Sequence, residues 1–267
     1  MLSRPLNLSA LYGVDTNVCY LKARPLHRTS RQAAADSSCG ARSLILGSPS
    51  PDGTSIAATA TNGLAYGLLQ HDMVEPFLLH FFAMSAHAYT RGSFTTPDVA
   101  DITDRDQPAG AYHAAAVVTV PIYLKWMLCF EEPETRTLWL AKATPRDWLA
   151  YGEAAVQAAN LTTRYGRVSF SLAASPNRTV YAVRASVSLP LSMATAGPEG
   201  GVRVRIRAPS QHAGRLSRVE VGGRAWTHFS AAEESVDIPR ELLTADLIKN
   251  GLHNIVATFT GKRRIVK

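Results

Sequence analysis

The chain has few cysteines and lacks the short motifs that mark common cofactor sites. Its 267 residues include Cys19, Cys39 and Cys129, an odd number at wide spacing. The sequence therefore predicts neither a disulfide framework nor a thiolate metal site, and Cys129, in an apolar run, is expected to be an inert core thiol. No GxGxxG, P-loop or GxSxG pattern occurs, which argues against dinucleotide enzymes, P-loop enzymes and α/β-hydrolases. We expect no cofactor.

Metal-binding and membrane signals are also missing. His71, His80 and His87 lie nine and seven residues apart rather than four, so they do not predict a zinc site. The most apolar run, 114–130, contains a proline and a lysine and is shorter than the ~20 residues that a bilayer span needs. It predicts a buried helix. The first residues carry one basic side chain before a broken apolar run, so we expect no secretory signal and no membrane partner.

The charge balance is modestly basic, at +7, and 46% of residues are hydrophobic, enough for a core. Positive charge alone is weak evidence for nucleic acid, and no aromatic-rich basic patch, zinc knuckle or RNP-like motif accompanies it. We therefore expect no nucleic-acid partner. Arg203, Arg205 and Arg207 alternate along one predicted strand. They are expected to form a solvated strand face, with an acidic glycan as the alternative partner.

Composition and periodicity divide the chain into three parts. Residues 1–60 are rich in Ser, Ala and Arg without a sustained period, which predicts an irregular or disordered start. Residues 61–132 carry helical patterns, and residues 133–267 carry strand patterns. The fold class predicted is α+β, with a few helices followed by an antiparallel β-sandwich.

The helical part contains one segment without a polar face. Two helices are predicted within 62–90, the second beginning near Pro76, which suits a first helical turn. A third is predicted over 111–130, with a kink at Pro121. The second helix is apolar on all sides, which indicates burial on all sides: Phe77, Leu78, Leu79, Phe81, Phe82 and Met84. One chain with so few helices offers little to surround it, so we expect a missing helical region or a protein partner to cover it.

The strand part shows alternation and turn signals. Buried or alternating segments are predicted at 138–140, 168–170, 180–189, 202–206, 216–221, 224–226, 235–239 and 254–260. Gly222-Gly223 joins two of them as a two-residue hairpin, where only glycine freely accepts a positive φ. Strands at this spacing favour an antiparallel sandwich.

The stretch between the two parts carries a family resemblance. LWLAKATPRDWL, followed by TRYGRVSF, is similar to a junction found in six-hairpin glycosidase-like proteins, and GLLQHDMVEPFLLHFFAMSAHAYTRGSFTTPD resembles a late helical hairpin of that family. The resemblance covers roughly residues 62–240. It implies an (α/α)6 toroid followed by a β-sandwich, of which this chain would hold only the C-terminal part. The residues in the expected order are Trp139, Lys142, Pro145, Arg146, Trp148, Tyr165, Gly166 and Ser169.

The resemblance implies glycoside hydrolysis, which normally needs two carboxyl groups across the scissile bond. Asp98 is the candidate catalytic carboxylate; the alternative is that it and Asp101 are turn or helix-cap residues. Tyr89, Arg91 and Trp148 are candidate carbohydrate-binding residues, since rings can stack on a sugar and a guanidinium can fork onto its hydroxyls. For the two aromatic residues the alternative is packing between domains, and for Arg91 it is an ion pair within the loop.

Three hypotheses follow from these features. The first is a carbohydrate-active protein resembling the C-terminal portion of a glycoside hydrolase, incomplete as an enzyme because most of the toroid is absent. The second is a non-catalytic β-sandwich module that binds glycans or a protein partner. The third is a truncated product without independent activity, in which exposed helices drive aggregation.

Overall fold

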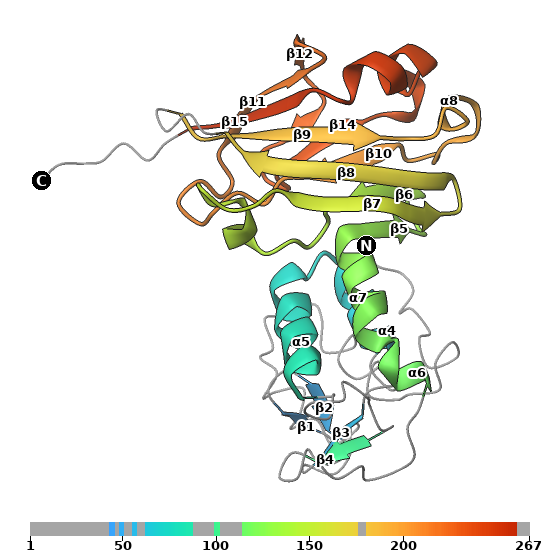
Figure 1. The fold of residues 1–267 in the computed structure, drawn as a ribbon, viewed down its shortest axis with the longest axis vertical. Helices are drawn as coiled ribbons and strands as arrows, with labels where there is room; N and C mark the ends of the chain where they lie inside the picture. The colour runs from blue at the N-terminus through green and yellow to red at the C-terminus, as the bar shows by residue number, and fades with distance from the viewer. Residues whose placement is uncertain are drawn as a thin grey trace, which may run out of the picture. The chain divides into compact units, whose positions relative to one another are not determined.

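The computed structural model describes residues 43–45, 48–50, 55–57, 62–87, 99–101, 114–175 and 180–260. It divides into two compact units, Met1–Leu124 and Lys125–Lys267. Helices dominate the described residues of the first unit, and two β-sheets dominate those of the second (Figure 1). The α+β class predicted from the sequence is confirmed.

The second unit contains a five-stranded and a six-stranded sheet. The five-stranded sheet has the order β13-β14-β10-β6-β5, and the six-stranded sheet has the order β12-β11-β15-β9-β8-β7, in which the last three strands run side by side in Figure 1. The strands are β5 (Cys129–Glu132), β6 (Thr137–Leu140), β7 (Val156–Thr163), β8 (Gly166–Ala174), β9 (Ala182–Ser188), β10 (Val202–Arg205), β11 (Leu216–Val221), β12 (Arg224–Trp226), β13 (Phe229–Ser230), β14 (Ser235–Ile238) and β15 (Ile255–Phe259).

Short helical turns connect these strands: η3 (Arg146–Leu149), α8 (Met193–Ala196), η4 (Arg240–Leu242) and η5 (Leu247–Gly251). The predicted Gly222-Gly223 hairpin is confirmed: Val221 pairs with Arg224, and the two glycines have φ of 59° and 75°. Positive φ at both central residues matches the twist of the flanking strands.

One strand pair departs from the antiparallel arrangement predicted. β6 and β10 are parallel, whereas every other pair in the two sheets is antiparallel. A parallel pair requires a long crossover connection. Here the connection is β7, β8 and β9, which belong to the other sheet, so the chain crosses between the layers and returns.

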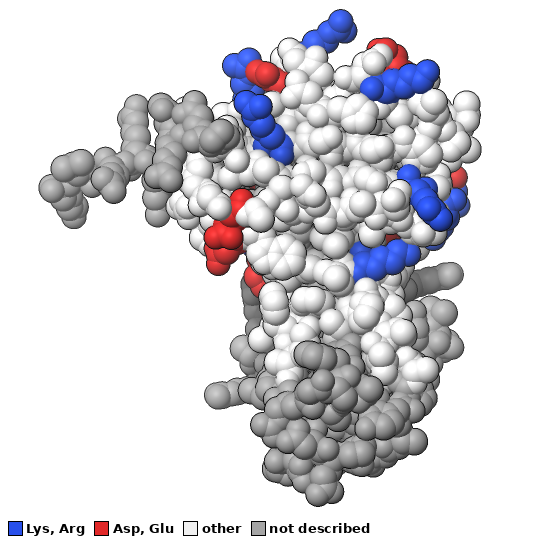
Figure 2. Space-filling model, in the orientation of Figure 1, with Lys and Arg blue, Asp and Glu red and all other residues white. Residues whose placement is uncertain are grey.

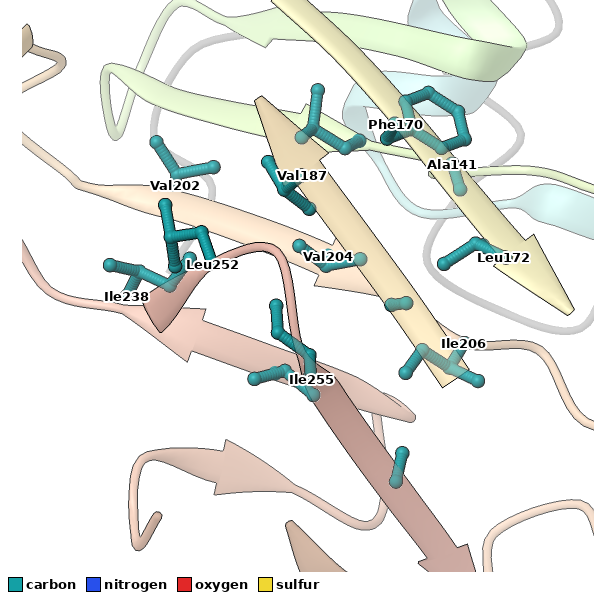
Figure 3. Close-up of a cluster of buried hydrophobic side chains, with 14 of the residues drawn as sticks. Ala141, Phe170, Leu172, Val187, Val202, Val204, Ile206, Ile238, Leu252 and Ile255 are labelled. Atoms are coloured by element: carbon teal, nitrogen blue, oxygen red, sulfur yellow. The ribbon is translucent and has the colours of Figure 1, made fainter. Parts of the chain in front are cut away.

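The inner faces of the two sheets share one hydrophobic core. Alternate residues of a strand can point inward, as in β10, where Val202 and Val204 are fully buried. Figure 3 shows side chains of β8 and β9, such as Leu172 and Val187, on the same cluster as those of β10. The two layers therefore form a sandwich-like body whose stability comes from this shared apolar interior.

The helical unit contains an aromatic cluster and an exposed apolar surface. Its helices are α4 (Asn62–Gln70), α5 (Val74–His87), α6 (Ala114–Val117) and α7 (Thr119–Leu128), which continues into the second unit. Phe77 and Tyr123 are fully buried with ring centroids 6.3 Å apart. Leu79 and Phe82 of α5 are 61% and 48% exposed. Burial on all sides of α5, which the sequence predicted, is therefore not achieved in this structure.

The helix predicted over 111–130 is corrected at two points. It is interrupted at Val118, between α6 and α7, three residues before the proline at which a kink is predicted. The proline lacks the N–H that would bond the carbonyl of Val117, and its ring clashes with that carbonyl, so the break falls there. The last two predicted helical residues, Cys129 and Phe130, begin β5 because they pair with Leu140 and Trp139 of β6.

Short strands occur where the sequence predicted irregular structure or a loop. β1 (Ser43–Ile45) pairs with β2 (Ser48–Ser50), and β3 (Ser55–Ala57) pairs with β4 (Val99–Asp101). Pro49 is tolerated in β2 because a strand in a two-stranded sheet has an open edge. Because these strands contain proline and serine, they lack the apolar alternation by which a strand is predicted from sequence.

Charged side chains do not gather into one basic area on the face shown in Figure 2. Over the described residues, Lys and Arg lie in small separate groups with uncoloured surface between them. No helix within the described ranges has the length and apolar character to cross a bilayer.

The shared core predicts where substitutions are costly. Leu140 is fully buried in β6, whereas Leu191 is 48% exposed. We expect Leu140→Ala to lower the free energy of unfolding by about 2–5 kcal/mol, because it removes apolar contacts and leaves a cavity. Leu191→Ala should change it by less than about 0.5 kcal/mol. Urea unfolding followed by tryptophan fluorescence measures both, and equal effects of the two variants would contradict the position of the core.

Candidate functional site

The structure describes one of the four residues that the sequence singles out. Tyr89, Arg91 and Asp98 lie outside the described residues, so their roles stay predictions. Trp148 lies in η3 and is 37% exposed. Asp101 is the last residue of strand β4.

Contacts on both sides hold η3 in place. The Arg146 guanidinium donates to the Ala208 carbonyl at 2.8 Å and pairs with the Glu234 carboxylate at 2.7 Å. At the other end Leu149 is buried, and its carbonyl accepts a hydrogen bond of 2.6 Å from the Tyr181 hydroxyl. The exposed Trp148 ring is therefore displayed from a turn whose backbone is fixed on both flanks.

Glu234 is a buried carboxylate with two roles in this region. Its side chain is 3% exposed; one oxygen accepts from Arg146 and the other from the Gly214 N–H at 3.0 Å. Its φ is +54°, and its carbonyl accepts from the Ile206 N–H at 2.7 Å. A left-handed conformation is uncommon for glutamate and persists only where surrounding contacts hold it. Glu234 therefore joins η3, the loop before β11 and the start of β14.

An aromatic group lies behind η3. The Tyr181 ring stacks on His212, with centroids 4.3 Å apart and planes at 8°, and meets Tyr151 and Phe259 edge-on at 5.3 and 5.5 Å. Burial raises the pKa of Tyr181, which keeps its hydroxyl protonated as the donor to Leu149. The other rings hold Tyr181, which in turn holds the C-terminal end of η3.

A cation-rich row follows the other face of the five-stranded sheet. Trp139 points away from the core, and three cations lie by its ring: Lys142 Nζ at 4.1 Å and the guanidinium carbons of Arg203 and Arg205 at 5.0 and 5.8 Å from the centroid. Such cations are attracted to the negative ring face. The row links β6 to β10, which are adjacent strands of the sheet.

The solvated face predicted for Arg205 and Arg207 is wrong. They are only 7% and 2% exposed, and Arg207 donates to the Thr144 carbonyl at 2.9 Å. Alternation assigns residues to a face but does not reveal what covers that face. Arg203 alone of the three keeps an accessible guanidinium, with its side chain 34% exposed.

Two of the hollows on the second unit are lined by described residues alone. One, of about 270 Å³, is lined by hydroxyl-bearing side chains of β8 and β9, among them Ser171, Ser186 and Ser188. It lies beside the bulge between Ala158 and Leu161 in β7. The other, of about 320 Å³, lies at the start of β10 and contains Arg203 with residues of β13 and β14. Neither includes Trp148.

Metal and thiol chemistry have no support in the described part of the chain. There, no three His, Cys, Asp or Glu side chains converge as metal ligands would. Burial raises the pKa of Cys129 to about 12, so its thiol stays protonated near neutral pH and is unreactive. The core role expected for this cysteine is confirmed.

Comparisons of this chain with family models, with curated proteins and with solved structures found no match.

Glu234 and Tyr181 position the site, and the sequence did not predict either role. Glu234 follows Glu233 in a stretch that reads as a polar turn, and its partner Arg146 is distant in the chain. Tyr181 begins a strand pattern and reads as an ordinary core residue. No local signal separates such residues from their neighbours, because the contacts arise only when the two sheets come together.

The clamp on η3 can be tested at Glu234. In Glu234→Gln the amide NH₂ must face either Arg146 or the Gly214 N–H, so a donor meets a donor. We expect the free energy of unfolding to fall by about 1–3 kcal/mol. The adjacent Glu233→Gln is the control: its ion pair with Arg203 is partly exposed, and the cost should stay below about 1 kcal/mol. Urea titration measures both, and a Glu233→Gln variant as unstable as Glu234→Gln would refute the clamp.

The stability of the second unit should depend on the protonation of His212. Burial lowers the pKa of His212 below its usual 6.5, so the fold favours the neutral ring. The stabilisation from neutral His212 is complete above about pH 6.5 and is lost as the pH falls through the lower value in the fold. His212→Phe keeps a ring against Tyr181 but cannot become charged. Between about pH 7.5 and pH 5, its unfolding free energy should fall less than that of the wild type; identical pH dependence would contradict this assignment.

Proposed function

We propose that this chain is a carbohydrate-active protein resembling the C-terminal portion of a six-hairpin glycoside hydrolase, and that its β-sandwich binds glycan through Trp148. The incomplete (α/α) toroid implied by the resemblance belongs to this proposal. Support comes from the arrangement of helices followed by two packed sheets and from the motif around η3, whose Trp148 lies on the surface.

The observation that carries the proposal is an exposed tryptophan on a fixed turn. A sugar presents C–H groups on its faces, and an indole ring that is already in place can stack on them with little loss of side-chain entropy. Arg146 and Leu149 on either side of Trp148 hold the turn. Asp147 and Glu153 are exposed near it in sequence, and their carboxylates can accept hydrogen bonds from hydroxyls.

Binding without turnover fits this chain better than hydrolysis. A glycosidase needs two carboxyl groups across the scissile bond, and the sequence provides one candidate, Asp98. The twelve-helix toroid of the family supplies the walls of such a site, whereas the sequence predicts about three helical segments here. We infer that the chain alone holds a glycan and does not cleave it.

A protein partner is the second candidate for the chain. Leu79 and Phe82 on α5 are well exposed for large apolar side chains, and apolar surface of this kind is typical of protein contacts. This alternative concerns the helical unit, so it leaves glycan binding by the sandwich unchanged.

Glycan binding is tested with the full chain on immobilised oligosaccharides and by calorimetry with those that are retained. We expect saturable binding in the wild type and an affinity at least about tenfold lower in Trp148→Ala, because truncating a central ring removes most of a stacking contact. Trp148→Phe should retain part of the affinity.

Leu191→Ala, which alters another exposed apolar residue of the same unit, is the matched control and should bind as the wild type does. The proposal fails if no oligosaccharide binds, or if Trp148→Ala binds as tightly as the control. Release of sugar from any bound oligosaccharide, abolished by Asp98→Asn, would instead establish hydrolysis.

A further inference from the structure

The hollow at the start of β10 brings charged and aromatic side chains together. It has a volume of about 320 Å³, within the range of small-ligand sites. Arg203 comes from β10, Asp237 from β14, Phe229 from β13, and His228 directly precedes β13. Three separate parts of the chain thus bring a cation, a carboxylate and two rings into one small space.

The two charged groups are placed side by side by the sheet. Arg203 and Asp237 are direct partners in the β10–β14 pairing, and the Arg203 Nε lies 3.6 Å from the carboxylate. Asp237 also accepts from the Ser235 hydroxyl at 2.8 Å, and the Trp139 ring lies 5.0 Å from the Arg203 guanidinium carbon. These contacts fix both groups before any ligand arrives.

This pair suits two neighbouring hydroxyl groups. A guanidinium only donates hydrogen bonds and a carboxylate only accepts them, so one hydroxyl can accept from Arg203 while the next donates to Asp237. Their side chains are 34% and 26% exposed, so both are accessible from the hollow.

The rings supply a surface for the apolar face of a ligand. The imidazole of His228 is exposed and stands edge-on to Trp226, at 5.6 Å between centroids. The Trp226 indole N–H donates to the Asp237 carbonyl at 2.9 Å, which ties this segment to β14. A pocket with a polar pair and adjacent rings matches a sugar, which carries hydroxyls at its edge and C–H groups on its faces.

Charge limits the class of sugar. Arg203 is the one cation lining the hollow among the described residues, and it already faces two carboxylates, those of Asp237 and Glu233. A ligand carboxylate or phosphate would have to compete with these two carboxylates for the Arg203 guanidinium. The hollow therefore favours an uncharged, hydroxyl-rich ligand.

We propose that the hollow between the start of β10, the end of β14 and the segment 227–229 is a second binding site, which takes a neutral sugar residue through Arg203, Asp237 and His228. This inference rests on the proposed function and names the ligand class of a site separate from Trp148. The two sites lie at opposite ends of β10, because η3 is tied to Ala208 and the hollow contains Gly200.

The test follows the His228 imidazole by NMR in the full chain, titrated with neutral monosaccharides (glucose, galactose, xylose, mannose) and with glucuronate. His228→Ala identifies the signal. We expect a saturable shift with at least one neutral sugar, a much weaker response to glucuronate, and an affinity about tenfold lower in Asp237→Asn. The shift should persist in Trp148→Ala, whose ring belongs to the other site.

The inference is overturned if no neutral sugar shifts the His228 signal, if glucuronate binds as well as the neutral sugars, or if Asp237→Asn binds as the wild type does. Glu233→Gln, which removes the partner of Arg203 that does not line the hollow, is the control and should keep the response. If His228 does not respond to sugars but glycan still binds through Trp148, only the proposal of this second site is refuted. Absence of Trp148-dependent binding would remove the proposed function, whatever happens at His228.

Discussion

The ion pair between Arg146 and Glu234 is the contact on which the arrangement around Trp148 depends. It joins the connection between β6 and β7 to the start of β14, and the same carboxylate holds the loop before β11 through Gly214. Burying a carboxylate is costly unless it is paired and hydrogen-bonded. Glu234 meets that condition only when three segments distant in sequence are in place, so its pairing depends on the fold of the second unit.

Strand β6 links the hydrophobic core to the cation-rich row. Leu138 and Leu140 point into the core, while Trp139 between them points the other way and holds Arg203 against its ring. Because successive side chains of a strand point to opposite faces, β6 packs in the core through its leucines and contacts cations through its tryptophan. The position of Arg203 in its hollow thus depends on β6, the strand that also contributes Leu138 and Leu140 to the core.

Much of the second unit can be predicted from its sequence, because its signals are local. The buried strand at 138–140 depends on a short apolar run and the two-glycine hairpin on positive φ, and both are confirmed. The parallel pairing of β6 with β10 could not be predicted, because it depends on how the intervening strands cross to the other sheet. The apolar character of Cys129 and Phe130 continues the helix before them and so predicts helix, but in the structure they pair with β6 as strand residues.

The candidate site was predictable only in part. The sequence and the resemblance pointed to Trp148, and the structure adds that its ring is exposed on a held turn. Tyr89, Arg91 and Asp98 stay predictions. Other features depend on contacts between strands that are distant in sequence, so no local pattern predicts them. They are the burial of Arg205 and Arg207, the clamp at Glu234 and the hollow at Arg203. In the helical unit, α5 forms the predicted helix, but Leu79 and Phe82 are exposed and not buried as predicted.

The central claim is that the sandwich holds glycan at η3 on a turn fixed before binding. Hydrogen exchange of the full chain, measured by mass spectrometry with and without the oligosaccharide retained most tightly, tests it most directly. The account predicts that peptides covering 144–151 exchange slowly in the free protein and more slowly with the sugar present, while those of α5 do not change. Fast exchange at 144–151 in the free protein, or protection by the sugar confined to the helical unit, would contradict it.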